Sequence, residues 1–294
     1  MRIVFIGSVE FSKMALEKVH QLGVDVKGIC TLKESSFNAD FYDLTSFANS
    51  KNIPCKYIKD INSSDTLKWI KDKSPDVIFC FGFSRLLGKE ILNLPALGVI
   101  GYHPAELPKN RGRHPLIWAL VLGLKKTAST FFFMDEGADN GDILSQSLID
   151  IDKNDDAGSL YKKVSERALI QIEEFLPKLM SGNYSRTKQN HELANTWRKR
   201  GYPDGKIDWR MAAKSIHNLV RGLAKPYVGA HFLHSDKEIK VWETEIIKCE
   251  ILNIEPGKVV DIDEKGCLII KCGEDSIKLI KIEPNHDIST GDYL

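Results

Sequence analysis

GVIGYHPAELPKNRGRHPLIW, residues 98–118, joins an apolar run, a histidine, a proline-containing turn and a basic cluster in that order. Its first residues, Gly98–Tyr102, have the largely apolar character of a strand buried on both faces of a parallel sheet. His103 follows at the end of this strand, and ligands in open α/β sheets collect at the carboxyl ends of strands. A second segment, MDEGADNGDIL at residues 134–144, adds carboxylates and glycines. The stretch therefore predicts an open sheet with a ligand crevice beside His103.

The residues before this stretch predict the same kind of sheet. Residues 2–7 (RIVFIG) indicate a buried strand, Ser8–Gly23 an amphipathic helix and Val24–Thr31 a second strand. Pro75–Phe81 indicates another central strand. We therefore expect a Rossmann-like α/β domain with a mostly parallel sheet. The first turn lacks the second and third glycines of the dinucleotide fingerprint, which disfavours a nicotinamide-dependent enzyme.

The residues after this stretch predict a second, smaller domain. Ser159–Met180 indicates a long helix, and the polar residues that follow indicate a linker across the surface. From Gly229 onward, short alternating segments separated by turn residues predict a small OB-like β-barrel. We expect a catalytic domain at residues 1–185, a linker at 186–205 and a β-rich domain at 206–294.

Composition excludes several classes of protein. The 294 residues carry a formal net charge of +1, so no global charge favours a nucleic-acid partner. No apolar run approaches the roughly 20 residues of a membrane span, and no signal peptide is present, so we expect a soluble, cytoplasmic protein. The six cysteines form no Cys-x-x-Cys pair and most lie in apolar runs, which favours buried thiols over a metal site or disulfides.

Each polar feature of the stretch has two interpretations on its own. His103 either faces the ligand crevice or only caps the end of a strand. The acids Asp135, Glu136 and Asp139 either orient that histidine or form a solvated surface, although the flanking glycines favour a close backbone approach to a ligand. The cations at residues 109–114 either bind an anion, since arginine forks suit phosphate oxygens, or form a solvated face.

Together these features resemble the formyltetrahydrofolate-dependent formyltransferase family. The resemblance lies in His103 at a strand end, Leu107-Pro108, Arg111-Gly112 and Asp139-Asn140-Gly141. It extends to Phe81-Gly82-Phe83 with Leu86-Leu87, which is similar to the folate-pocket loop of the family. Lys206–Trp209, His217–Arg221 and Pro226–Ala230 are similar to the start of its C-terminal domain, so the resemblance spans nearly the whole chain.

The resemblance implies roles for particular residues. His103 and Asp139 would be the catalytic pair: as an amine attacks the formyl carbon, His103 would stabilise the oxyanion and move protons, and Asp139 would hold His103. The predicted binding residues fall into two groups. Those for the co-substrate, N10-formyltetrahydrofolate, are Phe83, Arg85, Leu86, Asp135, Gly137 and Ala138. Those for the acceptor substrate are Ser8, Lys109, Arg111, Arg113 and His114.

The sequence departs from the family pattern at Gly101. The family has an asparagine two residues before the histidine, and that asparagine helps to polarise the formyl oxygen. Loss of an oxyanion donor typically costs about 10²–10³ in turnover. Ala105 also stands where many members have serine. Either another group replaces the asparagine, such as a backbone N–H near Gly101, His114 or a water molecule, or activity is reduced.

The formyl acceptor can be predicted only by resemblance. Arg111-Gly112-Arg113 followed by His114–Trp118 is closer to the sugar-nucleotide enzymes, so we expect a UDP- or dTDP-linked amino sugar, with a pseudaminic-acid-type precursor as one example. The alternative is methionyl-tRNA, for which the basic run Trp197–Arg200 is the only favourable feature. A third hypothesis is a non-catalytic protein that binds folate or a sugar nucleotide. The expected partners are thus small molecules rather than nucleic acid or membrane, and a homodimer is left open.

Overall fold

The computed structural model describes residues 1–35, 39–249, 253–284 and 287–294. The chain forms two compact units, and each takes segments from more than one part of the sequence. The first unit consists of Met1–Pro115, Thr127–Ile149 and Lys162–Trp197; the second consists of Leu116–Lys126, Asp150–Tyr161 and Arg198–Leu294. The predicted domain boundaries at residues 185 and 206 stay predictions.

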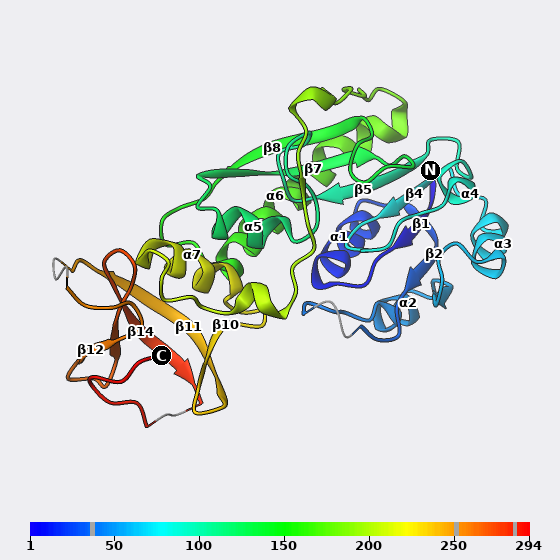
Figure 1. The fold of residues 1–294 in the computed structure, drawn as a ribbon. Helices are drawn as coiled ribbons and strands as arrows, with labels where there is room; N and C mark the ends of the chain where they lie inside the picture. The colour runs from blue at the N-terminus through cyan, green and yellow to red at the C-terminus, as the bar shows by residue number, and fades with distance from the viewer. Residues whose placement is uncertain (36–38, 250–252, 285–286) are drawn as a thin grey trace. The chain divides into compact units, whose positions relative to one another are not determined.

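A seven-stranded sheet of order β3-β2-β1-β4-β5-β7-β8 forms the centre of the first unit (Figure 1). Neighbouring strands from β3 to β5 are parallel, and β7 runs antiparallel to β5. The strands are β1 (Arg2–Ile6), β2 (Asp25–Thr31), β3 (Cys55–Tyr57), β4 (Val77–Cys80), β5 (Val99–His103), β7 (Lys126–Phe133) and β8 (Ile143–Asp150). The predicted mostly parallel α/β sheet is confirmed.

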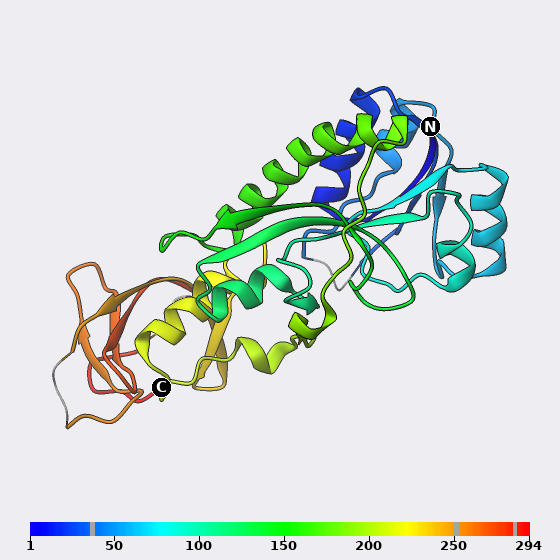
Figure 2. The same cartoon turned by 90° about the horizontal axis from the view of Figure 1, so that it is seen from above.

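Helices cover both faces of this sheet (Figure 2). On one face lie α1 (Glu10–Gln21) and α6 (Ala157–Ser181), which are joined by an ion pair between Lys18 and Glu173. On the other face, α3 (Ser64–Asp72) and α4 (Lys89–Leu92) share an apolar cluster with β1, β4 and β5. The remaining helix of this region, α2 (Thr45–Ser50), contacts α1 through the rings of Phe47 and His20.

Side-chain alternation along β5 decides which residues face the site. Val99 belongs to the cluster under α3 and α4, whereas the ring of Tyr102 lies 4.3 Å from that of Phe11 on α1. Because successive side chains of a strand point to opposite faces, Gly101 and His103 share the face of Val99. His103 is thus directed away from α1 and α6.

The second unit contains an antiparallel five-stranded sheet of order β10-β11-β14-β13-β12. Its elements are α7 (Ala213–Leu223), β10 (Ala230–His234), β11 (Lys237–Ile247), β12 (Val259–Ile262), β13 (Leu268–Lys271) and β14 (Ser276–Glu283). Trp209 and Phe232 pack edge to face in its core, beside the buried face of α7. The predicted fold class, an α/β domain followed by a small β-rich domain, is confirmed.

The predicted linker at 186–205 contains structure that the sequence did not indicate. Its residues Thr196–Trp197 (β9) pair in parallel with Arg111–Gly112 (β6), and Tyr202–Gly205 forms a short 3-10 helix. The pairing satisfies backbone groups of a loop that would otherwise lack partners.

Across the described ranges, none of the helices has both the length and the apolar character to cross a membrane.

Candidate active site

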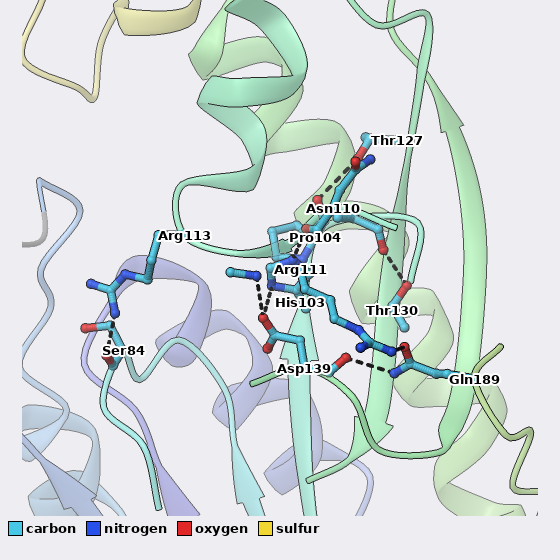
Figure 3. Close-up of polar contacts among 12 residues, drawn as sticks. Ser84, His103, Pro104, Asn110, Arg111, Arg113, Thr127, Thr130, Asp139 and Gln189 are labelled. Carbon is cyan, nitrogen blue, oxygen red and sulfur yellow. Dashed lines mark hydrogen bonds and ion pairs between the residues drawn. The ribbon is translucent and has the colours of Figure 1, made fainter. Parts of the chain in front are cut away.

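His103 occupies the position that the sequence predicts, at the carboxyl end of β5, and its side chain is buried. Its Nε2 lies 2.8 Å from the carbonyl oxygen of Asn110. A carbonyl oxygen can only accept a hydrogen bond, so Nε2 carries a hydrogen and donates it. The other ring nitrogen, Nδ1, faces Asp139 at 3.6 Å from Oδ2 (Figure 3). Nδ1 is therefore the ring atom that can exchange a proton.

Asp139 comes from the acidic loop after β7, so the fold joins the two predicted catalytic residues. Its Oδ2 accepts a hydrogen bond of 2.9 Å from the backbone N–H of Gly112 and is the same oxygen that faces His103. The residue has φ of +56°, a left-handed conformation that is uncommon for non-glycine residues. Gly141 allows the tight loop, because a Cβ there would lie 1.8 Å from the carbonyl oxygen of Phe133.

The turn between His103 and the basic cluster is fixed by polar side chains of β7 and β8. Thr127 and Thr130 donate hydrogen bonds to the carbonyl oxygens of Pro104 and Ala105, at 3.2 and 2.7 Å. Gln146 donates to the carbonyl oxygen of Leu107 at 2.8 Å. Ala105, which stands where many members of the family have serine, is fully buried in this turn. These bonds hold the loop that carries Asn110 to His103 and Gly112 to Asp139.

The predicted acceptor-binding residues lie in three different environments. Arg111 is buried, and its Nη2 lies 2.6 Å from Oε1 of Gln189 and 3.1 Å from Nδ1 of His191. Arg113 instead reaches the loop after β4, where its Nη1 donates to the carbonyl oxygen of Ser84 at 2.6 Å. Lys109 is at the surface near Glu106. Arg113 thus joins the loop of residues 109–114, here called the acceptor loop, to the predicted folate loop after β4.

Two further acceptor-site predictions fall on residues with little exposure. Ser8 is fully buried after β1, and its Oγ has no hydrogen-bond partner among the described residues. His114 has φ of +56° and directly precedes α5 (Pro115–Val121). Contact of either residue with a substrate stays a prediction.

The predicted folate-binding residues lie on two loops at the same edge of the sheet. Phe83 packs against the cluster under α3 and α4, whereas Leu86 is 67% exposed. Arg85 donates a hydrogen bond to the carbonyl oxygen of Lys59. On the second loop, the backbone N–H of Gly137 donates to Asp135 Oδ1 at 3.1 Å, and Ala138 is exposed. An exposed leucine beside a polar site offers apolar contact to a flat ring system.

Gln189 is a functional candidate that the sequence reasoning missed. It is buried in the polar segment predicted to be a linker, yet its Nε2 donates to the carbonyl oxygens of Asp139 and Gly141 at 2.9 and 2.7 Å. No local pattern marks this residue. Its partners at positions 111, 139 and 141 are far away in the sequence.

The space at Gly101 is filled by neighbouring side chains. A Cβ at this position would lie 2.8 Å from Met134 Cγ and 3.0 Å from Phe132 Cζ. Met134 and Phe132 thus lie over β5 where a side chain at residue 101 would stand.

Two family models match the chain. Residues 1–174 match the model "Formyl transferase", and residues 201–291 match the model "Formyl transferase, C-terminal domain". The chain belongs to the formyl transferase family. This membership is consistent with the prediction, made from the sequence, that His103 and Asp139 lie together at the edge of the sheet.

Relatives within the family carry different names. A methionyl-tRNA formyltransferase of Caldanaerobacter subterraneus subsp. tengcongensis is 33% identical over 288 residues, which cover 96% of this chain and 92% of the relative. The bifunctional polymyxin resistance protein ArnA of Wigglesworthia glossinidia brevipalpis is 30% identical over 285 residues, or 96% of this chain and 43% of the relative.

A solved structure has the same fold. The N-formyltransferase of Helicobacter canadensis, solved with folinic acid and dTDP-3-aminofucose, has a TM-score of 0.70 at 17% identity and covers 94% of this chain and 98% of its own. At this identity the likeness supports the fold alone.

Proposed function

We propose that this enzyme moves a formyl group from N10-formyltetrahydrofolate to the free amine of a UDP- or dTDP-linked amino sugar. The observation that carries the reaction type is the single carboxylate oxygen, Asp139 Oδ2, that meets both the N–H of Gly112 and Nδ1 of His103. Family membership supports formyl transfer with folate, and the acceptor is the finer part of the proposal.

The catalytic pair has separate tasks. The carbonyl of Asn110 holds Nε2 of His103, which leaves Nδ1 to take up and release a proton. Asp139 orients the ring and offsets the positive charge that it gains. Proton transfer by a positioned group of this kind typically contributes about 10²–10⁴ in rate.

The two loops beside the pair fit a folate co-substrate. Phe83 and Leu86 offer apolar surface, and the loop 135–138 offers backbone N–H groups and carboxylates. When bound, the folate would supply the formyl group. Burial of Leu86 on binding would also remove a large exposed apolar side chain from water.

Two structural features favour a sugar nucleotide over a tRNA: the position of Arg113, and the internal partners of arginines in the basic run Trp197–Arg200. Arg113 bonds to the loop that would hold the folate, so a diphosphate near it would lie close to the formyl group. In the basic run, Arg198 pairs with Asp204, and the guanidinium of Arg200 lies 4.6 Å from the ring centre of Trp118. Both cations therefore have internal partners, which weakens the one feature that favoured a tRNA.

Methionyl-tRNA is the second candidate acceptor, and the sequence comparisons support it better than they support an amino sugar. The relative at 33% identity, which matches over nearly its whole length, bears the name of that activity. Overall sequence similarity thus favours methionyl-tRNA, whereas the local contacts of Arg113 and Arg198 favour a sugar nucleotide.

A direct competition of acceptors tests the proposal. The purified enzyme, with N10-formyltetrahydrofolate, is offered dTDP-3-aminofucose, UDP-linked amino sugars and methionyl-tRNA in parallel. We expect kcat/KM for a nucleotide sugar to exceed that for methionyl-tRNA by at least about 10²-fold. Equal or better turnover of methionyl-tRNA would reject the amino sugar. Binding of folate and a nucleotide sugar without formyl transfer would leave the third, non-catalytic hypothesis.

A further inference from the structure

The segment 186–197 builds part of the active site although it lies between the two family models, which match residues 1–174 and 201–291. It accepts three hydrogen bonds from main-chain N–H groups of the acceptor loop, residues 109–114. Asn195 Oδ1 accepts from the N–H of Asn110 at 2.8 Å, and its carbonyl accepts from the N–H of Arg111 at 3.0 Å. The carbonyl of Trp197 accepts from the N–H of Arg113 at 3.1 Å.

The same segment contacts the catalytic loop through one buried side chain. The amide of Gln189 donates one hydrogen to the carbonyl of Asp139 (Figure 3) and the other to the carbonyl of Gly141. Its oxygen accepts from Arg111. All of the polar atoms of this amide thus have partners, and these partners lie on the two loops that meet at Asp139.

We infer that Gln189 is a positioning residue for formyl transfer, which acts by holding Asp139 in place. The inference rests on the proposed role of Asp139. A left-handed non-glycine residue costs of order 1–3 kcal/mol and persists only where its surroundings fix it. Gln189 fixes the carbonyl of Asp139 itself, and its second bond fixes the loop two residues later. Asp139 Oδ2 stands 3.6 Å from His103, so a small displacement of the loop separates the pair.

Two variants separate the donor role of Gln189 from its volume. Gln189→Glu keeps an acceptor for Arg111 but removes the hydrogens given to Asp139 and Gly141. Gln189→Met keeps the length of the side chain and removes all polar atoms without adding a charge. Lys188→Ala is the matched control, because Lys188 is the exposed neighbour in the same segment.

Amide hydrogen exchange, measured by NMR, reports on Asp139 without any substrate. The N–H of Gly112 bonds to Asp139 Oδ2, whereas the N–H groups of Arg111 and Arg113 bond to Asn195 and Trp197. In both variants we expect exchange at Gly112 to accelerate by about 10-fold or more, as for loss of a hydrogen bond to a charged group. The exchange rates of the amides of residues 111 and 113 should stay within about 2-fold of the wild-type rates. In Lys188→Ala, the rates of the amides of residues 111, 112 and 113 should all stay within the same range.

Kinetics provide the second readout, with whichever acceptor the competition assay selects. Gln189→Glu and Gln189→Met should lower kcat by about 10²-fold, as for a catalytic group misplaced by about 1 Å, while KM for the folate changes little. In an Asp139→Asn background, the further loss should be below about 3-fold, because the two residues act as one unit.

The outcomes separate this inference from the proposed function. Unchanged exchange at Gly112 in both variants would overturn the positioning role. So would a full 10²-fold loss on top of Asp139→Asn, since Gln189 would then act elsewhere. If Asp139→Asn alone keeps full turnover, the proposed catalytic role fails, and faster exchange at Gly112 would show that Gln189 still holds the loop.

Discussion

Replacement of Gly101 by asparagine tests whether this chain has merely lost the asparagine of its family or has rebuilt the site without it. If the glycine is a simple loss, Gly101→Asn should restore an oxyanion donor and raise turnover. If the site has been rebuilt, the new side chain should find its space occupied. The structure favours the second outcome, because Met134 and Phe132 lie over this position.

The packing sets the size of the effect. A Cβ at residue 101 would lie 2.8 and 3.1 Å from Met134 Cγ and Sδ, and 3.0 Å from Phe132 Cζ. Carbon atoms pack best at about 3.5–4.0 Å, so each contact is too short by roughly half an ångström or more. Phe132 is only 2% exposed, so its ring is enclosed by neighbouring atoms, whereas a methionine side chain such as that of Met134 adapts more readily. Overpacking of this kind typically costs about 1–3 kcal/mol.

A double-mutant cycle provides the assay. We expect Gly101→Asn to lower the thermal midpoint by about 2–12 °C, from about 2–4 °C per kcal/mol for a domain of this size, and to lower kcat. Met134→Ala makes room, so the double variant should be more stable than the sum of the single changes by about 1 kcal/mol or more. Wild-type stability together with higher turnover in Gly101→Asn would refute this reasoning.

Three other predictions address binding, catalysis and pH. Arg113→Ala should raise KM for the acceptor about 10-fold or more, as for loss of a charged hydrogen bond, and leave the Kd of tetrahydrofolate within about 2-fold; unchanged acceptor affinity would remove Arg113 from the site. His103→Asn and Asp139→Asn should each lower kcat by about 10² or more, with a combined loss far below the product; full activity of His103→Asn would reject the mechanism. Burial lowers the pKa of His217 and of His231 below the ordinary value of 6.5, so the folded state binds protons less readily than the unfolded chain. The free energy of unfolding of the second unit should therefore fall as the pH drops below about 6.5, and His217→Gln should reduce this slope between pH 7.5 and 5.5; an unchanged slope would contradict it.

The fold could be predicted from the sequence because its elements depend on local patterns. The apolar runs at β1, β4 and β5 are buried strands, and the helical spacing of α1 and α6 places their apolar faces on the sheet. The short pairing of β6 with β9 could not be predicted in this way. Two-residue strands have no periodicity, and their partners are 85 residues apart in the chain.

The proximity of His103 and Asp139 could likewise be predicted, because a histidine at a strand end and an aspartate in a glycine-flanked loop fit a known family pattern. Their catalytic role stays a prediction. The different contacts of Arg111 and Arg113 could not be predicted from the sequence. Arg111 and Arg113 belong to one basic triplet in the sequence, yet Arg111 lies in β6 whereas Arg113 follows it, beyond Gly112 with its φ of +99°. Arg111 contacts Gln189 in the interior, and Arg113 contacts Ser84 on the predicted folate loop.

The different contacts of Arg111 and Arg113 affect what the triplet Arg-Gly-Arg can indicate about the acceptor substrate. If Arg111 holds Gln189, and Gln189 holds Asp139, then Arg111 stabilises the loop that carries Asp139. In that case the presence of Arg111 carries no information on the acceptor. Only Arg113 then remains to distinguish a sugar nucleotide from a tRNA. The test of Arg113→Ala therefore weighs more for the acceptor than any change at Arg111, where loss of activity would follow with either substrate. An Arg111→Lys variant should accordingly lower kcat for every accepted amine by a similar factor, and a loss confined to one acceptor would return Arg111 to the binding site.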